Sequence, residues 1–290
     1  MQQPKVEELK VQQPKAWPAP AKINLFLHVL GKRPDGYHDL QTVFQFLDYG
    51  DDLFFEIQND GQVIRDYDYG FSEKDDLCLR AVALLKPLAK PECGVKIGLT
   101  KRLPVGGGLG GGSSNAATTL IALNQLWDIG LNRPELAELG LKLGADVPVF
   151  VMGQAAWAEG VGERLTPVNL AENWYLVLNP QINVSTAQVF SHKHLTRAPQ
   201  MKKIRALEKG IDSTFGENQL EAIVLAEYPE VNAIFEWLSQ YGKPRMSGSG
   251  GSVFLPIENQ EQGLKLLKIK PSSTVGFIAR GMNIHPLLMR

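Results

Sequence analysis

The sequence predicts a two-domain α+β protein, and three observations lead to this prediction. The chain has 290 residues, which at roughly 150 residues per domain allows two ordinary domains or one large one. A glycine-rich segment at residues 106–112 lies between a short strand-like run and an amphipathic helical pattern. After about residue 166, strands and helices follow one another with long crossovers, which suggests a second domain built as a ferredoxin-like sandwich.

Composition excludes several classes of protein. Hydrophobic residues make up 44% and charged residues 21%, which is typical of a globular chain and excludes disorder throughout. A net charge of −1 argues against nucleic acid or an anionic membrane as the main partner, but it allows an anionic small substrate. Apolar runs are far shorter than the ~20 residues that cross a bilayer, and the N-terminus lacks a secretion signal. Two cysteines, Cys78 and Cys93, are too few for a disulfide framework or a metal knuckle, so we expect a reduced, cytoplasmic protein.

The first half is expected to begin with a strand, after a disordered polar extension at residues 1–16. From residue 21 the residues alternate in a way that places two sets of side chains on opposite sides of a strand. One set is Ile23, Leu25, Leu27 and Val29, and the other is Lys22, Asn24, Phe26 and His28. The Pro-Asp-Gly run at residues 34–36 predicts a turn, because Pro fixes φ and Gly accepts a positive φ. Further strands are expected at residues 42–47, 53–57 and 95–99.

Three helices complete the first domain, which we assign to residues 17–165. Residues 77–88 have a helical pattern that ends near Pro87. The clearest helix runs from about residue 113 to residue 127, because apolar residues recur there at i, i+4, i+7 and i+11. The third helix begins at Asn132 with a capping-box pattern completed by Glu135, and it ends at residue 144.

The second domain is assigned to residues 166–290. We expect strands at residues 174–178, 253–257 and 274–280, two helices between residues 217 and 241, and a helix at residues 261–268. Strands connected by helices and by one possible hairpin predict an α+β sandwich.

The glycine-rich segment predicts a phosphate-binding loop. Six of the seven residues at 106–112 are glycine, and glycine lets the backbone approach a ligand closely with successive N–H groups turned toward it. The helix that follows adds free N–H groups and a partial positive charge at its N-terminus. Ser113 and Ser114 would cap that helix or offer hydroxyls to a phosphate or a magnesium ion. A flexible linker is the alternative, but a linker is not expected between a strand and an amphipathic helix.

The segment fits none of the most familiar phosphate loops. Gly106, Gly108 and Gly111 match the dinucleotide pattern G-x-G-x-x-G, but no second strand follows to deliver an acidic residue to the ribose. A Walker loop needs Lys after Gly112, where this chain has Ser113. The H-R-D and D-F-G elements of protein kinases are absent from the sequence.

Three motifs resemble those of the GHMP kinases. Residues 103–117 (LPVGGGLGGGSSNAA) are similar to the central nucleotide motif of that family, with Gly112 and Asn115 interposed in its serine–alanine run. Residues 20–29 (PAKINLFLHV) resemble the first motif, and residues 247–254 (SGSGGSVF) resemble the third. The resemblance covers the chain from about Trp17 to its end. It implies the two-domain GHMP kinase fold, in which an N-terminal domain like domain 2 of ribosomal protein S5 and a ferredoxin-like C-terminal domain enclose an active cleft.

Three other segments narrow the resemblance within the family. Residues 31–51, 143–151 and 158–167 are similar to those of the family members that phosphorylate a cytidine diphosphate sugar alcohol. The resemblance implies an enzyme that transfers a phosphate from ATP to a hydroxyl of this small molecule, with Mg²⁺ as cofactor. It implies no nucleic acid and no membrane partner. The sequence leaves open whether the chain is a monomer or a homodimer, and which residues bind magnesium.

The resemblance assigns catalysis to Lys22 and Asp146. Asp146 lies between Gly144 and Pro148, where a rigid turn would hold its carboxylate; from the residues alone an ordinary turn aspartate fits equally well. Lys22 and Asn24 lie on the same side of the first strand, about 7 Å apart. Lys22 would pair with Asp146, although a lysine in such a strand is more often a surface residue with its stem buried. The resemblance gives Asn24 a substrate contact.

The resemblance also assigns residues to each substrate. Tyr37 and His38 would bind the cytosine together with Phe190 and the hydroxyl of Thr186, although a tyrosine after a turn more often packs on its own protein. The residues implied at ATP are Lys101, Pro104, Val105, Gly106, Gly107, Gly108, Leu109, Gly110, Gly111, Gly112, Ser113 and Ser114. Asp76 stands where the family usually has Asn, which leaves its adenine contact open. His192 and His194 lack a third metal ligand and are expected at the surface.

Three alternative functions remain to be compared. Another GHMP kinase, of the homoserine or mevalonate type, is disfavoured by Tyr37 and His38. A catalytically silent sugar or nucleotide sensor on the same fold has no need of a base, so Lys22 and Asp146 disfavour it. A nicotinamide-dependent oxidoreductase is disfavoured by the missing second strand.

Overall fold

The computed structural model describes residues 15–195 and 216–289. All but the last two residues of the expected extension at residues 1–16 therefore lie outside the described residues. The strands are β1 (Trp17–Lys32), β2 (His38–Gln58), β3 (Val63–Arg65), β4 (Gly94–Thr100), β5 (Ala156–Gly160), β6 (Arg164–Pro167), β7 (Trp174–Asn179), β8 (Arg245–Met246), β9 (Val253–Ile257) and β10 (Val275–Met282). The helices are α1 (Leu77–Leu85), α2 (Gly111–Leu126), α3 (Arg133–Leu141), α4 (Val147–Met152), α5 (Thr186–Ser191), α6 (Glu221–Glu227), α7 (Pro229–Ser239) and α8 (Gln260–Ile269), with 3₁₀ turns at Lys86–Leu88 and Pro286–Leu288.

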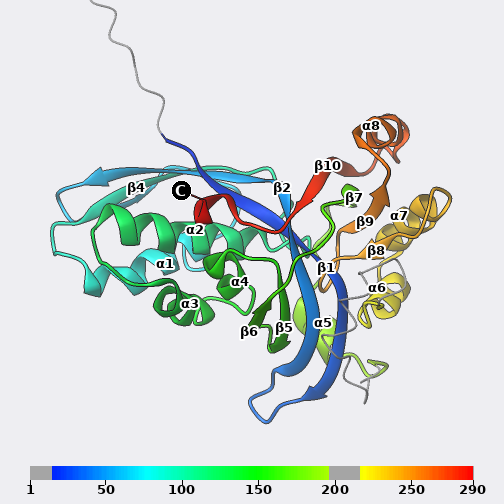
Figure 1. The fold of residues 1–290 in the computed structure, drawn as a ribbon, viewed down its shortest axis with the longest axis horizontal. Helices are drawn as coiled ribbons and strands as arrows, with labels where there is room; N and C mark the ends of the chain where they lie inside the picture. Colours follow the sequence, from blue (N-terminus) through cyan, green and yellow to red (C-terminus); the bar gives the residue numbers. More distant parts are fainter. Residues whose placement is uncertain (1–14, 196–215, 290) are drawn as a thin grey trace, which may run out of the picture.

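All of these strands belong to one hydrogen-bonded sheet. Its main path runs β3-β4-β2-β10-β7-β9-β8, and β1 and β5 also pair with β2. Figure 1 shows two lobes, with α1 to α4 beneath β2 and β4 in one lobe and α6 to α8 on the outer flank of the other. The long hairpin of β1 and β2 lies where the lobes meet (Figure 1). A site between the lobes can therefore draw residues from both.

The core of the first lobe lies between the sheet and helices α1 to α4. The four apolar positions that predicted α2, namely Ala116, Leu120, Leu123 and Trp127, are all buried in it. The capping box predicted at α3 is confirmed, because the Asn132 side chain accepts the N–H of Glu135 and the Glu135 carboxylate accepts the N–H of Asn132. These local signals depend only on residues close together in the sequence.

The second lobe confirms the ferredoxin-like expectation. Its strands are antiparallel in the order β10-β7-β9-β8, with α6 and α7 between β7 and β8, and α8 between β9 and β10. This is a βαββαβ arrangement. A second apolar cluster lies in this lobe, and a third joins the lobes through residues of β1, β2, β7 and β10.

The strand at the start of the chain departs from simple alternation. A β-bulge between Asn24 and Leu27 shifts the register, so that Asn24 faces Phe44 while Leu27 faces Thr42. Leu27 therefore packs in the second lobe's cluster, whereas Leu25 packs in the cluster that joins the lobes. The two expected sets of side chains hold only up to the bulge, because one extra residue reverses the side to which later residues point.

Two further expectations are wrong in detail. The strands expected at residues 42–47 and 53–57 are a single strand, β2, because the polar residues between them are stabilised by tertiary contacts. Asp51, for example, is buried and accepts the N–H groups of Arg102 and Leu103. Helix α2 begins at Gly111 instead of Ser113, with Gly110 as its N-cap. No helix within residues 15–195 and 216–289 is long and apolar enough to cross a membrane.

Candidate active site

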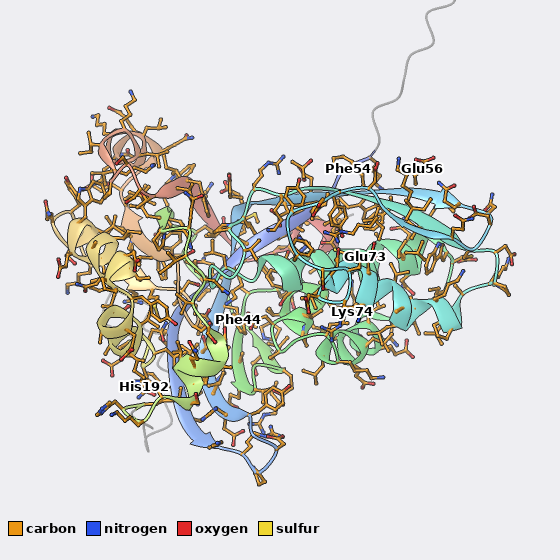
Figure 2. The ribbon with its side chains drawn as sticks, turned by 180° about the vertical axis from the view of Figure 1, so that it is seen from behind. Phe44, Phe54, Glu56, Glu73, Lys74 and His192 are labelled. Carbon is orange, nitrogen blue, oxygen red and sulfur yellow. The ribbon has the colours of Figure 1, made fainter. Side chains whose placement is uncertain are left out.

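A cavity of about 880 Å³ lies between the lobes. It is lined by the glycine-rich loop, by β1 and β2, by α5, and by the turn of the third motif. Phe44, one of the lining residues, lies near the centre of the molecule in Figure 2. Of the residues that the sequence predicted for the site, all line this cavity except Leu109 and Ser114, which are buried beside it.

Lys22 and Asp146 meet in this cavity. The Nζ atom of Lys22 lies 3.1 Å from Oδ2 of Asp146, with the lysine side chain 3% exposed and the carboxylate 32% exposed. Lys22 also donates to Oδ1 of Asn24 at 2.6 Å and to the carbonyl of Gly108 at 3.2 Å. Its three N–H groups thus have three acceptors, one of them a carboxylate that remains open to the cavity.

The backbone of Asp146 begins helix α4, but its side chain does not cap that helix. It occupies the N-cap position of α4, yet its side chain makes no capping hydrogen bond. The following Pro148 lies in the first turn of that helix and needs no N–H partner there. The carboxylate is therefore free to pair with Lys22, and removing its charge should disturb α4 little.

The glycine-rich loop needs its glycines for conformation and for close approach. Gly106, Gly108 and Gly110 have φ values of +68°, +74° and +70°, in the left-handed region that side chains disfavour. A Cβ on Gly108 would lie 2.2 Å from the carbonyl oxygen of Ser247, on the turn of the third motif. The loop is thus pressed against the second lobe.

Hydrogen bonds join this loop to the third-motif turn. Ser247 Oγ donates to the carbonyl of Gly108 at 2.9 Å, and the N–H of Ser252 donates to the carbonyl of Gly107 at 3.1 Å. Helix α2 has no side-chain cap, so neither serine caps it as the sequence suggested. The N–H groups of its first turn are left for a ligand, as in anion-binding helix termini.

Lys101 anchors the beginning of the loop. Its Nζ atom lies 2.7 Å from Oδ2 of Asp51 and 2.8 Å from the carbonyl of Leu103. Asp51 is fully buried and also accepts two backbone N–H groups from the same segment. This buried ion pair was not visible in the sequence, because Asp51 lies about 50 residues away on β2.

Asp76 uses its acceptors inside the protein. One oxygen accepts the N–H groups of Cys78 and Leu79 and so caps α1. The other accepts the hydroxyl of Tyr67 at 2.6 Å and lies 3.2 Å from Nε of Arg65. Three hydrogen bonds and one ion pair thus occupy both oxygens, and burial raises the pKa of the Tyr67 phenol, which stays protonated as a donor.

This arrangement predicts that Asp76→Asn lowers the stability of the protein and does not change how it binds ATP. The amide keeps the cap but leaves the buried Arg65 without its carboxylate, so the free energy of unfolding should fall by about 1–3 kcal/mol, while KM for ATP stays within a few-fold. Denaturant unfolding and steady-state kinetics measure the two. Asp75→Asn, at the exposed neighbour that accepts from Ser72, is the control for stability. A large rise in KM for ATP with unchanged stability would show that Asp76 reads the base.

The far end of the cavity carries aromatic rings. His38 and Phe190 stack with their centroids 5.4 Å apart and an interplanar angle of 29°, while Tyr37 is 62% exposed. Thr186 is hydrogen-bonded to Ser249 through their hydroxyls, 2.7 Å apart. The ring that stacks on Phe190 in this structure is therefore His38.

Several lining residues were missed by the sequence analysis. Thr42 and Phe44 reach the site only because β2 pairs with β1 in the observed register. Asn115 lies in the first turns of α2, and its buried Oδ1 has no hydrogen-bond partner among the described residues. Ser249 lies within the third motif, so the sequence did contain a pattern that could have identified it as a site residue. His192 lies at the edge of the molecule in Figure 2, 3.6 Å from Glu227.

The chain resembles known proteins over most of its length. The family model described as the GHMP kinases N terminal domain matches residues 76–154, and the GHMP kinases C terminal model matches residues 198–268. The 4-diphosphocytidyl-2-C-methyl-D-erythritol kinase of Thiobacillus denitrificans is 50% identical over 94% of this chain and 97% of its own. The kinase of the same name from Tolumonas auensis is 50% identical over 94% of each chain.

Solved structures agree with these matches. A crystal structure of 4-(cytidine 5'-diphospho)-2C-methyl-D-erythritol kinase has a TM-score of 0.79 and 32% identity, covering 92% of this chain and 99% of that one. Methanococcus jannaschii mevalonate kinase shares the fold, with a TM-score of 0.65 at 17% identity, over 94% of this chain and all of that one. With two family models in order, relatives at 50% identity and this fold, the chain belongs to the GHMP kinase family.

Proposed function

We propose that this chain transfers the γ-phosphate of ATP to the 2-hydroxyl of 4-diphosphocytidyl-2-C-methyl-D-erythritol, a step of the non-mevalonate isoprenoid pathway. The observation that carries the proposal is the 50% identity, over 94% of the chain, to a kinase named for that substrate. The Lys22–Asp146 pair in the cavity between the lobes supports a catalytic role and disfavours a silent sensor.

Asp146 acts as the base in this proposal. Its partly exposed carboxylate would accept the proton of the substrate hydroxyl as that oxygen attacks phosphorus. Lys22 holds the carboxylate in place and contributes positive charge where negative charge develops on the transferring group. Asn24, which accepts from Lys22 and lines the cavity, would contact the sugar alcohol.

The glycine-rich loop and the N-terminus of α2 would bind the phosphates of ATP through backbone N–H groups. Magnesium fits this cleft as an ion that arrives with ATP, since it usually binds few protein oxygens and keeps substrate phosphates and waters as ligands. Ser113, which lines the cavity, is the residue that would hold it. When bound, the ion would neutralise charge on the phosphates.

The opposite end of the cavity would bind the cytidine part. Tyr37 and Phe190 would flank the cytosine, with His38 and Thr186 as polar contacts. Since His38 stacks on Phe190, a base between Tyr37 and Phe190 must use the other face of Phe190 or displace His38. We further propose that the cleft separates domains at residues 17–165 and 166–290, and that the enzyme acts in the cytoplasm as a monomer or homodimer.

The proposal is tested by ADP release with ATP, Mg²⁺ and three acceptors: the cytidylyl substrate, mevalonate and homoserine. Turnover with the cytidylyl substrate alone is expected, and phosphorus NMR of the product should show a new phosphomonoester on the sugar alcohol. Turnover with another acceptor would indicate a different GHMP kinase. Ligand binding without turnover of any acceptor would favour the sensor.

Tyr37→Ala should separate the two substrate sites. Base–aromatic stacking contributes roughly 1–3 kcal/mol per base, so KM for the cytidylyl substrate should rise about 5- to 150-fold. KM for ATP should hardly change. Tyr37→Phe, the matched control, should have a mild effect because the ring supplies most of the stacking. If Tyr37→Ala raises both KM values alike, or neither, the cytidine does not bind at this residue.

A further inference from the structure

We propose that Thr42 is a positioning residue for catalysis, whose hydroxyl fixes the orientation of the Asn24 amide and thereby the place of the Lys22 ammonium. The inference rests on the proposed kinase function, since it assigns to Thr42 the task of positioning the residues Lys22 and Asp146 that would catalyse phosphate transfer. Thr42 lines the cavity from β2, and its hydroxyl is committed to two partners inside the protein.

A continuous chain of hydrogen bonds connects Thr42 to the catalytic pair. Oγ1 of Thr42 accepts from Nδ2 of Asn24 at 2.8 Å and donates to the carbonyl of Phe26. Oδ1 of Asn24 accepts from Nζ of Lys22 at 2.6 Å, and Lys22 lies 3.1 Å from Asp146. Thr42, Asn24 and Lys22 are each no more than 2% exposed, so water cannot replace these bonds easily.

The direction of every bond in this chain follows from one proton. A hydroxyl has a single proton, and a carbonyl oxygen can only accept, so the Thr42 proton must point to Phe26. The lone pairs of Thr42 then face Asn24, which must present its NH₂ group there and its oxygen to Lys22. A flipped amide would set the NH₂ group of Asn24 against the ammonium, donor to donor.

The pairing of β1 with β2 explains why a threonine on β2 can do this. Between Asn24 and Leu27, β1 has two residues, Leu25 and Phe26, opposite one residue of β2. The carbonyl of Phe26, within this bulge, accepts the hydroxyl of Thr42. Thr42 is two residues from Phe44, the partner of Asn24, so its side chain lies on the same side of the sheet as Asn24.

The orientation of the Asn24 amide affects the position of the Lys22 ammonium. A lysine side chain has four rotatable bonds, and its position against Asp146 depends on the acceptors that hold its ammonium. Those acceptors are Asn24, Gly108 and Asp146. Without the Thr42 hydroxyl the Asn24 amide is free to turn, and the ammonium loses a directed partner at the transition state.

The test compares Thr42→Val, which removes the hydroxyl at nearly constant volume, with Thr42→Ser, which keeps it. Thr42→Val should lower kcat about 10- to 100-fold with KM for both substrates within about threefold, and Thr42→Ser should stay within about threefold of wild type. Thr118→Val is the matched control. Thr118 is also buried and donates to a β1 carbonyl, that of Pro18, but it does not line the cavity. This control should keep kcat within about twofold of wild type.

Two measurements decide whether Thr42 acts through Asn24. In a double-mutant cycle, adding Thr42→Val to Asn24→Ala should lower kcat by less than about twofold more, because residues of one network are not additive. Full additivity, or a loss of activity that Thr42→Ser shares, would overturn the proposal. So would a kcat for Thr42→Val within about twofold of wild type.

The second measurement needs no turnover. In nitrogen-15-labelled full-length protein, the side-chain amide protons of Asn24 should exchange with water at least about tenfold faster in Thr42→Val than in wild type or Thr118→Val. Equal exchange rates would overturn the positioning role. Wild-type protein that fails to phosphorylate the cytidylyl substrate would instead contradict the proposed function, and the exchange experiment would still decide on Thr42.

Discussion

Asp146→Asn is expected to lower kcat by about 10²–10⁴, the usual contribution of general acid–base catalysis. The amide keeps the size and shape of the side chain but cannot accept the hydroxyl proton. Substrate affinities should change little, because the Asp146 side chain is only partly buried and makes no cap to α4. Steady-state kinetics with the cytidylyl substrate and ATP measure kcat, and calorimetry measures the two affinities.

Asp52→Asn is a suitable control for this change. Asp52 lies on β2 and pairs with Arg102 at 2.6 Å, but it does not line the cavity. Its replacement should leave kcat within about twofold of wild type. An Asp146→Asn enzyme that turns over within a few-fold of wild type would show that Asp146 is not the base.

Gly108→Ala is expected to lower kcat/KM for ATP by at least about 10²-fold, because small displacements of a positioning element have effects of that size. The new Cβ would lie 2.2 Å from the carbonyl oxygen of Ser247, and 2.9 Å from that of Gly250. The loop or the third-motif turn must therefore move. Binding of the cytidylyl substrate, measured by calorimetry without ATP, should survive better, since Tyr37 and Phe190 lie on other elements.

Gly130→Ala separates conformational strain from close approach. Gly130 also has a positive φ, +83°, but a Cβ there would meet no atom within 4 Å. Its replacement should cost about 1–2 kcal/mol of stability, the usual penalty for a left-handed conformation, and leave kinetics unchanged. If both variants show the same kinetics, the glycines of the loop are needed only for their φ values.

Much of the glycine-rich part of the candidate site could be predicted, because its signals are local. Gly106, Gly108 and Gly110 adopt positive φ values, which glycine tolerates best, and such a backbone conformation depends on residues close together in the sequence. The helical period of α2 and the capping box of α3 are equally short-range. The order of three motifs in one chain then indicated the family, and with it the residues that line the cavity.

The tertiary structure alone decided what those residues touch. The sequence could not distinguish a surface Lys22 from the buried one that pairs with Asp146, because the two residues lie more than 120 positions apart. It could not show that the Asp76 carboxylate pairs with Arg65 and accepts the hydroxyl of Tyr67, or that Lys101 pairs with Asp51. Polar side chains resemble turn or surface residues until their partners are known.

The sequence by itself determined the family, the glycine-rich loop and most of the secondary structure, since these depend on neighbouring residues and on periodicity. It did not determine the register of β1 against β2. One extra residue between Asn24 and Leu27 reverses the facing of the side chains that follow it, as far as the next register shift between Val29 and Gly31, and only the pairing of the two strands reveals it. Thr42 reaches Asn24 through that pairing, so its place behind Lys22 was decided by tertiary contacts and not by any pattern in the chain.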